Sequence, residues 1–532
     1  MSHWWLGLVG AVLVLSLCSR RRKELPTPPG PRISLFGLWN GVAMPSSFQW
    51  LTYAEWRKTY GSDLIFLNVL RNPILVINSV QVAQDLLEKR SAIYSSRPIR
   101  VMQKDVMGFN FLFTGMEYDA WYKEHRTMFH HHFHRNVVQR YQALQQRHAN
   151  TLLRNLAHTP NETTAAVVLE ICYGIHVADA GDEYIALADQ ALAGISSSGN
   201  FGTFFVDYFP LLQYMPAWLP GAKFKREGLK ARRLSSRLFN YAFDSVKQKL
   251  EEGCPEPSLM TMELESLFRD APKKSRAEER ERIIKDVVAT TYAAGSDTTL
   301  STLLSFFLAM VLHPQVQAKA WAELERVVPK DRLPCFGDRD RLPYITCIAW
   351  ECLRWQPSVN IALGHYSTET DEYKGYRIPK GTTCLANIWA MLHDPMHYPD
   401  PSKFDPDRFM DAKLNQSRNI NANPEIAFGF GRRICPGRFL ALDTIWIVIA
   451  STLCSYRICE AVDIRGKEVE PRLEYTTGLI RWVIPCDFLF FIWLNLAALH
   501  VRLSIGSFRD VKTQRSWWSL RLVQKVDLCA SM

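Results

Sequence analysis

A single cysteine, Cys435, stands among glycines and the arginines Arg432 and Arg433 in the segment 428–437. Glycine lets the backbone approach a flat partner closely, and the two positive charges are expected to lower the pKa of the thiol. Apolar residues at helical spacing follow from 438 to 453. A thiolate in a loop before a helix is how a cysteine is presented to haem iron, whereas an isolated cysteine in a glycine-rich turn is usually a buried structural residue.

A second polar stretch, 294–299, reads Ala-Gly-Ser-Asp-Thr-Thr and lies within 281–312, where the spacing of apolar residues predicts a long helix. Glycine, serine, aspartate and threonine are poor helix formers, so their presence inside this helix favours a functional role. A threonine hydroxyl here can bond to the preceding turn and bend or open the helix. The alternative is a polar turn that faces solvent.

The elements that must hold these groups are mainly helical. Apolar residues at helical spacing run from about 82 to 328, while 64–77 predicts two strands with a turn and 373–384 predicts a short hairpin. The segment 199–220 is crowded with aromatic residues and prolines. It is interpreted as an apolar loop with short helices, which either packs on the core or covers a ligand. With no internal repeat, the pattern predicts one compact domain, mainly α with a small β-rich part.

The cysteine segment resembles the loop of the cytochrome P-450 family, Phe-x-x-Gly-x-Arg-x-Cys-x-Gly. The matching residues are Phe428, Gly431, Arg433, Cys435 and Gly437. The resemblance covers roughly residues 26–480. It implies a single P-450-type haem domain in which Cys435 is the axial ligand to the iron of haem b. The other four residues of the motif are then expected to bind the cofactor.

The same resemblance identifies the polar stretch as part of a long central helix across the oxygen-binding face of the haem. It implies that Asp297 and Thr298 form an acid–alcohol pair that delivers protons to oxygen on the iron. Gly295 would leave room for that oxygen.

A structural ion network is also implied. Glu351 and Arg354 share one face of a helix and can pair, although this spacing usually marks a solvated salt bridge. They match the family's Glu-x-x-Arg. Arg408 lies in a Pro-Asp-Arg-Phe element where the family has Pro-Glu-Arg-Phe, so it is expected to join them in a buried triad.

Haem propionates need cationic partners, and the resemblance points to Arg433, His365 and Arg126. The family has Trp-x-x-x-Arg at the last of these positions. Here the residue four before Arg126 is Tyr122, so a tyrosine is expected to take the place of the tryptophan. A shift of one residue would instead align a tryptophan with a histidine.

Other kinds of site are disfavoured. Histidines at 130, 131, 132 and 134 are interpreted as a solvated helix end, with a metal cluster as the alternative. The 12 cysteines include no Cys-x-x-Cys pair, so zinc is not expected. The net charge of +10 comes without a long basic stripe, which does not indicate nucleic-acid binding.

The resemblance places substrate contacts in segments that are apolar with few charges, so the substrate is expected to be hydrophobic. These segments are 102–112, 200–214, 293, 358–363 and 476–479. The sequence of 475–478 most resembles that of fungal microsomal members of the family, which serve secondary metabolism or xenobiotic oxidation. Terpenoids, polyketides and polycyclic aromatics are therefore the expected substrate classes.

The implied reaction inserts one atom of O₂ into such a molecule. Electrons would come from NADPH through a separate cytochrome P-450 reductase, since no glycine-rich nucleotide loop lies in a strand–helix context. A peroxide-using or isomerising haem-thiolate enzyme is disfavoured because those enzymes dispense with the acid–alcohol pair. A non-catalytic haem-binding sensor or an inactive paralogue stays open as the alternative.

The amino terminus predicts a membrane anchor. Residues 4–18 carry no charge and four basic residues follow at 20–23. Residues 1–23 are thus expected to be retained in the endoplasmic reticulum membrane with the catalytic domain in the cytosol, rather than cleaved as a signal. Residues 24–32 form a proline-rich hinge, and 33–487 form the catalytic domain.

The carboxy-terminal tail, 488–532, is atypical because it shows neither strand alternation nor a helical stripe. The favoured interpretation is a translated intron or a shifted frame in the gene model, under which 481–532 would pack poorly. The alternative is a membrane-surface helix, which suits its basic and aromatic residues. Asn161 and Asn415 begin glycosylation-type sequons whose use the sequence leaves open.

Overall fold

The computed structural model describes most of the catalytic region. The described residues are 25–31, 45, 47–70, 72–155, 162–176, 183–198, 203–270, 274–410, 423–462, 468–469, 471 and 473–483. The predicted anchor, the tail 488–532 and both sequon asparagines lie outside them.

The described part is mainly helical with a small β component, as the sequence predicts. Its helical elements, with η marking most of the short turns, are α2 (Gln49–Tyr60), α3 (Val80–Ala83), η2 (Gln84–Lys89), α4 (Ser91–Tyr94), η3 (Met102–Val106), η4 (Phe113–Gly115), α5 (Ala120–Phe133), η5 (Val138–Tyr141), α6 (Gln142–Asn155), α7 (Glu162–Tyr173), α8 (Glu183–Ser198), α9 (Phe205–Tyr208), η6 (Pro210–Tyr214), α10 (Lys223–Glu251), α11 (Leu259–Asp270), α12 (Lys274–Leu312), α13 (Pro314–Val327), η7 (Phe336–Arg341), α14 (Pro343–Trp355), α15 (Ile388–Leu392), η8 (Pro406–Phe409), η9 (Pro424–Phe428), η10 (Gly431–Arg433) and α17 (Arg438–Ser455). The strands are β1 (Leu64–Val69), β2 (Asn72–Ile77), β3 (His365–Tyr366), β4 (Asp371–Tyr373), β5 (Tyr376–Ile378), β6 (Thr383–Ala386), β7 (Ala461–Val462) and β8 (Glu468–Val469).

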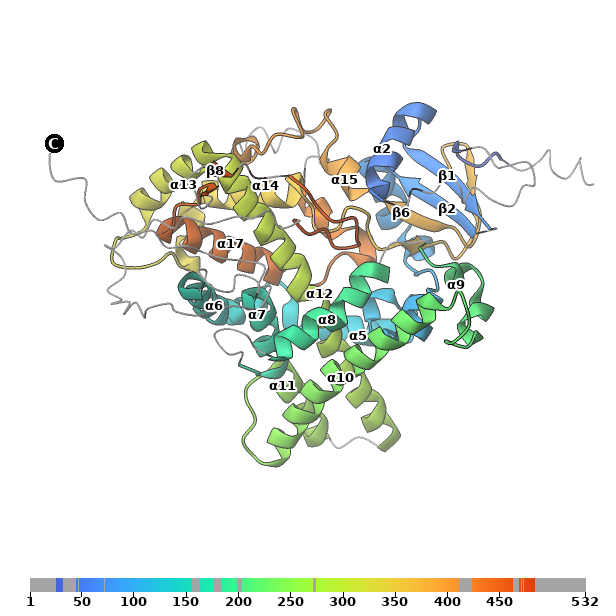
Figure 1. Ribbon diagram of the computed structural model, residues 1–532, viewed down its shortest axis with the longest axis horizontal. Helices are drawn as coiled ribbons and strands as arrows, with labels where there is room; N and C mark the ends of the chain where they lie inside the picture. The colour runs from blue at the N-terminus through green and yellow to red at the C-terminus, as the bar shows by residue number, and fades with distance from the viewer. Residues whose placement is uncertain are drawn as a thin grey trace, which may run out of the picture.

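The largest sheet of the described part has the order β1-β2-β6-β3. Strands β1 and β2 are antiparallel, with Leu64 opposite Ile77, and β2 runs parallel to β6. The predicted strand pair is therefore present. Its turn lies at Leu70, whose φ of 51° is in the left-handed region, so that Asn72 and Pro73 belong to β2. Figure 1 shows this sheet at one end of the molecule, beside α2.

The predicted hairpin at 373–384 begins earlier than the sequence indicates. Strands β4 and β5 pair over Asp371–Ile378, and the turn between them uses Lys374 and Gly375, both with positive φ. Such a two-residue turn matches the twist of the flanking strands. The segment Thr383–Ala386 instead joins the large sheet as β6, because its side chains are buried there.

The proline-rich segment is not a free spacer over its described part. The Pro29 carbonyl accepts the N–H of Phe66 at 2.9 Å, and the Pro26 carbonyl accepts that of Arg377 at 2.9 Å. A Cβ on Gly30 would lie 2.0 Å from the Phe66 carbonyl oxygen, so only glycine fits against β1. Proline lacks an N–H but keeps its carbonyl, and this segment uses those carbonyls to pair with β1 of the large sheet and β5 of the hairpin.

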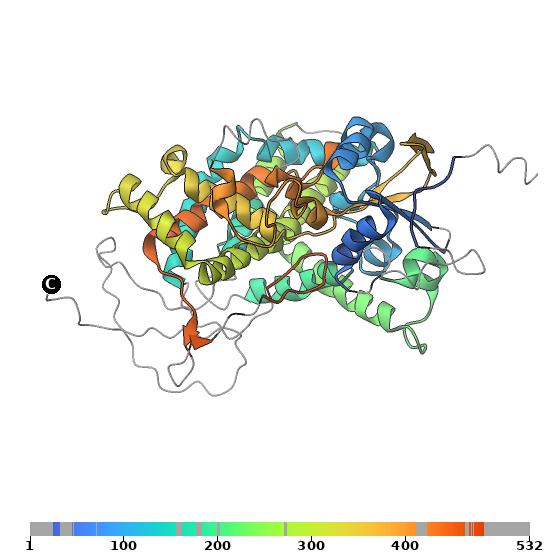
Figure 2. The same ribbon diagram turned by 90° about the horizontal axis from the view of Figure 1, so that it is seen from above.

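Helix α12 crosses the middle of the molecule, between the sheet at one end and α13 and α17 at the other (Figures 1 and 2). Both α12 and α17 are long and apolar enough to cross a membrane, but most of each is buried in the core. They are therefore core helices, and the expectation of an anchor stays with residues 1–23, outside the described part.

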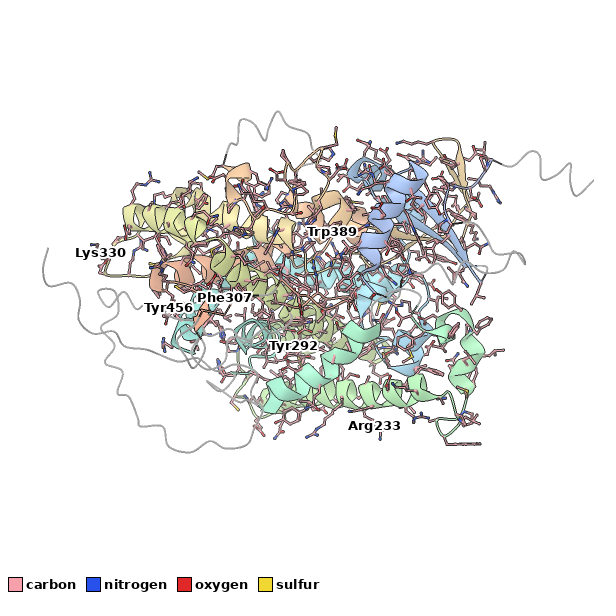
Figure 3. The ribbon with its side chains drawn as sticks, turned by 45° about the horizontal axis from the view of Figure 1, so that its top comes forward. Arg233, Tyr292, Phe307, Lys330, Trp389 and Tyr456 are labelled. Atoms are coloured by element: carbon pink, nitrogen blue, oxygen red, sulfur yellow. The ribbon has the colours of Figure 1, made fainter. Side chains whose placement is uncertain are left out.

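Two parts of the hydrophobic core meet along α12. Its first half, to Ala293, packs with α7, α8 and α10, and its second half, from Leu303, packs with α13, α14 and α17. Tyr292 belongs to the first part and Phe307 to the second, and Figure 3 shows Tyr292 near the centre of the molecule. The polar stretch falls between the two parts, where the packing leaves a cavity.

Candidate active site

A cavity of about 270 Å³ lies between α12, α17 and the cysteine loop. It gathers side chains that are remote in the sequence. Of the residues with predicted functions at the haem, those that line it are Tyr122, Arg126, Gly295, Thr298, His365, Phe428, Arg433, Cys435 and Gly437. Asp297 and Gly431 do not line it.

The cysteine loop is closed by a hydrogen bond from the N–H of Cys435 to the carbonyl of Phe428, 2.8 Å long. Gly431 has a φ of 58°, and a Cβ there would lie 2.1 Å from the carbonyl oxygen of Leu87. This glycine is thus needed for the close contact of the loop with η2. Helix α17 then begins at Arg438, which leaves the sulfur of Cys435 at the cavity wall.

The electrostatics at Cys435 differ from the prediction. Burial raises the pKa of the thiol, and the N–H of Gly437 with the charges of Arg126 and Arg438 opposes that rise. Arg432 and Arg433 are not the source of the stabilising charge. The Arg433 guanidinium turns away to donate to the carbonyls of Ser95 and Met116, each at 2.7 Å.

Three arginines and a histidine that is neutral near pH 7 meet at one side of the cavity. Burial, followed by repulsion from Arg433, lowers the pKa of Arg97 to about 9. Burial, followed by the charge of Arg97, lowers the pKa of His365 to about 3. Burial also lowers the pKa of Arg126 and of Arg433. Such a cluster is costly unless an anion compensates it, so the site is built to receive negative charge.

One atom of this cluster marks where the anion would lie. Nη1 of Arg433 is buried without a hydrogen-bond partner within the described part of the chain. The other guanidinium nitrogens of Arg433 bond to backbone carbonyls, and its plane lies 3.6 Å from the ring centroid of Tyr122. Tyr122 therefore orients Arg433 by stacking, which is a use that tyrosine shares with tryptophan.

These residues fit haem b. The propionates supply the negative charge that the cationic cluster lacks, and the thiol of Cys435 is the soft donor that iron takes in haem-thiolate sites. Arg97 is a member of the cluster that the sequence did not identify. Its guanidinium donates to the carbonyls of Thr114, Leu363 and Gly364, so only the folded chain brings it here.

The polar stretch of α12 borders the same cavity. The hydroxyl of Thr298 donates to the carbonyl of Ala294 at 2.9 Å, as expected for a threonine that bonds to the preceding turn. Burial, followed by the charge of Asp189, raises the pKa of Asp297 to about 7. A Cβ on Gly295 would lie 3.2 Å from Val168, so this glycine also lets α7 pack closely on α12.

Glu351, Arg354 and Arg408 lie together on the other side of α14. Arg354 donates to both carboxylate oxygens of Glu351, at 2.7 and 2.8 Å, and Nε of Arg408 donates to Glu351 at 3.2 Å. The side chains of Glu351 and Arg354 are 0% exposed. Arg354 also donates to the carbonyls of Leu392 and Pro401, so the network ties α14 to the end of α15 and to the segment before η8.

A second cavity of about 540 Å³ adjoins the first, since both share Thr298, Ala294 and Leu363. Parts of the segments 102–112, 293, 358–363 and 476–479 line one or both cavities, as predicted for substrate contacts. The segment 203–214 does not line either cavity. Asp207 instead accepts the N–H of Met102 at 2.8 Å, which fastens α9 to the outside of η3.

The histidine-rich end of α5 is only partly solvated. His132 is buried and bonds to Glu263 at 2.6 Å and to Arg140 at 2.7 Å. His130 and His131 are exposed, as predicted. Within the described residues no group of histidines, cysteines and carboxylates could hold a metal ion.

Residues 481–483, the described part of the segment 481–532, are packed, contrary to the expectation for them. Val483 pairs with Tyr475, and the hydroxyl of Ser301 donates to the carbonyl of Arg481. The guanidinium of Arg481 lies 4.0 Å from the ring centroid of Tyr475. Residues 481–483 thus connect to α12 through the backbone of Arg481, and Val483 is buried. The rest of that segment lies outside the described residues.

Comparisons with known proteins agree with this geometry. A family model described as Cytochrome P450 matches residues 28–476. Cytochrome P450 monooxygenase 98 of Postia placenta is 40% identical over 478 residues, covering 88% of this chain and 90% of that protein. Tryptamine 4-monooxygenase of Psilocybe cyanescens is 34% identical over 484 residues, covering 90% of this chain and 94% of that protein. A solved zebra fish cytochrome P450 with abiraterone shares the fold, with a TM-score of 0.64 at 22% identity over 82% of this chain and 97% of that one. The protein therefore belongs to the cytochrome P450 family, oxidoreductases that bind haem through a cysteine on the iron.

Proposed function

We propose that this monooxygenase inserts one oxygen atom of O₂ into a hydrophobic small molecule of the terpenoid, polyketide or polycyclic aromatic class. The observation that carries the proposal is that Cys435 and Thr298 line one cavity, which adjoins the larger apolar one. The balanced reaction is substrate C–H plus O₂, NADPH and a proton, giving C–OH, NADP⁺ and water. Electrons would arrive from a separate NADPH–cytochrome P450 reductase.

The residues that would hold haem b are those of the first cavity. Cys435 would bind the iron, and Arg97, Arg126, His365 and Arg433 would face the propionates. Haem supplies the activation of O₂ when it is bound. The protein supplies a thiolate, buried positive charge and a cavity that separates the substrate from bulk water.

Proton delivery is assigned to Asp297 and Thr298. Because its pKa is raised to about 7, the carboxyl of Asp297 is protonated in a large fraction of molecules at neutral pH and can give up that proton. The Thr298 hydroxyl stands at the cavity wall and can hold a proton at Oγ1. Its own hydrogen is donated to the Ala294 carbonyl, which leaves the lone pairs of Oγ1 free to accept a proton.

Thr298→Ala is expected to keep haem but to lower the product formed per NADPH by about tenfold or more, because an ordered proton donor contributes factors of 10² to 10⁴ to catalysis. The electrons would instead leave as peroxide, by O₂ plus NADPH and a proton giving H₂O₂ and NADP⁺. The measurement is product, peroxide and NADPH in microsomes with added reductase, on a panel of terpenoids, polycyclic aromatics and tryptamine. Tryptamine is included because one relative is named for it.

Thr59→Ala is the matched control, since Thr59 also bonds to its own helix, through the carbonyl of Glu55 at 3.1 Å, and lines neither cavity. An unchanged ratio of product to NADPH in Thr298→Ala would show that Thr298 does not relay protons. A wild type that consumes no NADPH on any panel member would favour the haem sensor or inactive paralogue.

Membrane attachment at the endoplasmic reticulum is proposed from residues 1–23, and a surface of the described part supports it. Large apolar side chains of the segment 205–218 are strongly exposed, namely Phe205 (61%), Phe209 (50%), Leu211 (81%), Tyr214 (74%) and Trp218 (79%). Helix α10, which follows this segment, begins with several basic residues, and Figure 3 shows Arg233 of α10 at the lower edge of the molecule. Apolar and basic groups side by side suit the interface of a bilayer.

Deleting residues 1–23 is expected to move most of the protein from the membrane pellet to the supernatant in high salt. The remaining contact through 205–218 is shallow, and salt screens its basic part. Fractionation with an immunoblot measures the outcome. Complete retention of the truncated protein would contradict the predicted anchor.

A further inference from the structure

The carbonyl oxygen of Thr298 receives hydroxyl donors from two places. Ser358 Oγ donates to it at 2.8 Å, and Thr302 Oγ1 donates to it at 3.2 Å. The two hydroxyls also lie 2.9 Å from each other. A helical carbonyl ordinarily accepts one N–H from the following turn. The turn of α12 that carries Thr298 is therefore attached to a residue outside the helix.

Ser358 is itself hydrogen-bonded through its main chain to the segment around Arg481. Its carbonyl accepts the N–H of Arg481 at 2.9 Å, and the carbonyl of Arg481 accepts the hydroxyl of Ser301. Because Ser301 follows Thr298 on α12, these bonds close a ring through three segments. The ring is anchored by the Arg481 guanidinium, which stacks on Tyr475 and donates to Gln356.

The location of the ring gives it a function beyond stability. Thr298, Thr302 and Ser358 all line the cavity that contains Cys435. Loss of one neutral hydrogen bond costs only about 1 kcal/mol. The effect on the position of Thr298 is expected to be larger than this effect on stability, since a displacement of about 1 Å at a reacting group can lower a rate by about 10²-fold.

We propose that Ser358 is a positioning residue that fixes the Thr298 turn of α12 over the reaction cavity. The inference rests on the proposed relay function of Thr298. The Ser358 hydroxyl sets where the Thr298 carbonyl stands, and the chain segment around Arg481 holds Ser358 in place. The residue acts through Thr298 and does not itself transfer a proton.

The test compares Ser358→Thr with Ser358→Val in the full chain, because these two side chains have the same shape and differ by the hydroxyl. Both are measured in microsomes with reductase, on the panel compound that the wild type oxidises with the highest yield. Ser358→Val is expected to lower product per NADPH about three- to tenfold and to raise peroxide accordingly, with the thiolate-type carbon monoxide spectrum intact. Ser358→Thr is expected to stay near the wild-type yield. Ser235→Ala removes a buried hydroxyl of another helix, α10, bonded at 3.1 Å to the carbonyl of Arg232 and outside both cavities, and should leave the yield unchanged.

The decisive arm repeats the change in the Thr298→Ala background. If Ser358 acts through Thr298, Ser358→Val has no further effect on the yield there. An equal loss of product per NADPH in the wild-type and Thr298→Ala backgrounds would overturn the inference. Equal yields for Ser358→Val and Ser358→Thr would also overturn it, provided that Thr298→Ala lowers product per NADPH. If Thr298→Ala itself leaves the yield unchanged, the proposed relay fails and the inference fails with it.

Discussion

Replacing Cys435 with alanine is expected to abolish the thiolate-type carbon monoxide difference spectrum and all NADPH-dependent product formation. Cys435 is the one cysteine among the described residues that line the cavity. No other soft anionic donor stands at that wall, so a bound haem would take a different axial ligand or none. The reduced carbon monoxide spectrum of solubilised protein is the measurement.

Cys347→Ala provides the matched control. Cys347 is also buried, in the core between α14 and the large sheet, and burial raises its thiol pKa to about 12. Its loss should cost some stability and leave the spectrum unchanged, because it does not line the cavity. Retention of the thiolate-type spectrum in Cys435→Ala, or its loss in Cys347→Ala, would contradict the ligand assignment.

Glu351→Ala is expected to give the largest loss of folding stability, about 3–5 kcal/mol, because it leaves two arginines without their buried carboxylate. Most of the variant should accumulate without haem. The measurement is the fraction of protein with a thiolate-type spectrum, together with chemical unfolding of the purified chain.

Two further variants show whether the stability loss in Glu351→Ala comes from unpaired buried charge or from lost packing. Glu351→Leu combined with Arg354→Leu removes both buried partners and should cost less than the sum of the single changes. Lys58→Ala breaks an exposed pair with Glu55 and should change stability by less than about 0.5 kcal/mol. Additive costs in the first comparison would mean that Glu351 contributes through packing alone.

The parts of the site that the sequence predicts are those defined by short spacing. Cys435 and Phe428 lie in one short loop, and Glu351 and Arg354 lie one helical turn apart. Their relative positions therefore follow from their spacing in the sequence. The long helix around Thr298 could be predicted for the same reason, since apolar periodicity extends on both sides of it.

The parts that the sequence does not reveal depend on contacts between distant segments. Arg97 is bonded to carbonyls 17 to 267 positions away, and nothing near it in the chain signals a binding residue. Ser358 belongs to a predicted substrate segment, but its bond to Thr298 needs the folded positions of α12 and the 481 segment. The reason for Gly431 was likewise hidden, because its close neighbour is the backbone at Leu87.

Labelling with ¹⁸O₂ tests most directly whether this chain is a monooxygenase. Wild-type protein with reductase and NADPH is given the panel under ¹⁸O₂ in ordinary water, and the products are analysed by mass spectrometry. One ¹⁸O atom per inserted oxygen is the predicted result, with Cys435→Ala giving no product. Products whose oxygen comes from water, or unlabelled products that also form with Cys435→Ala, would contradict it.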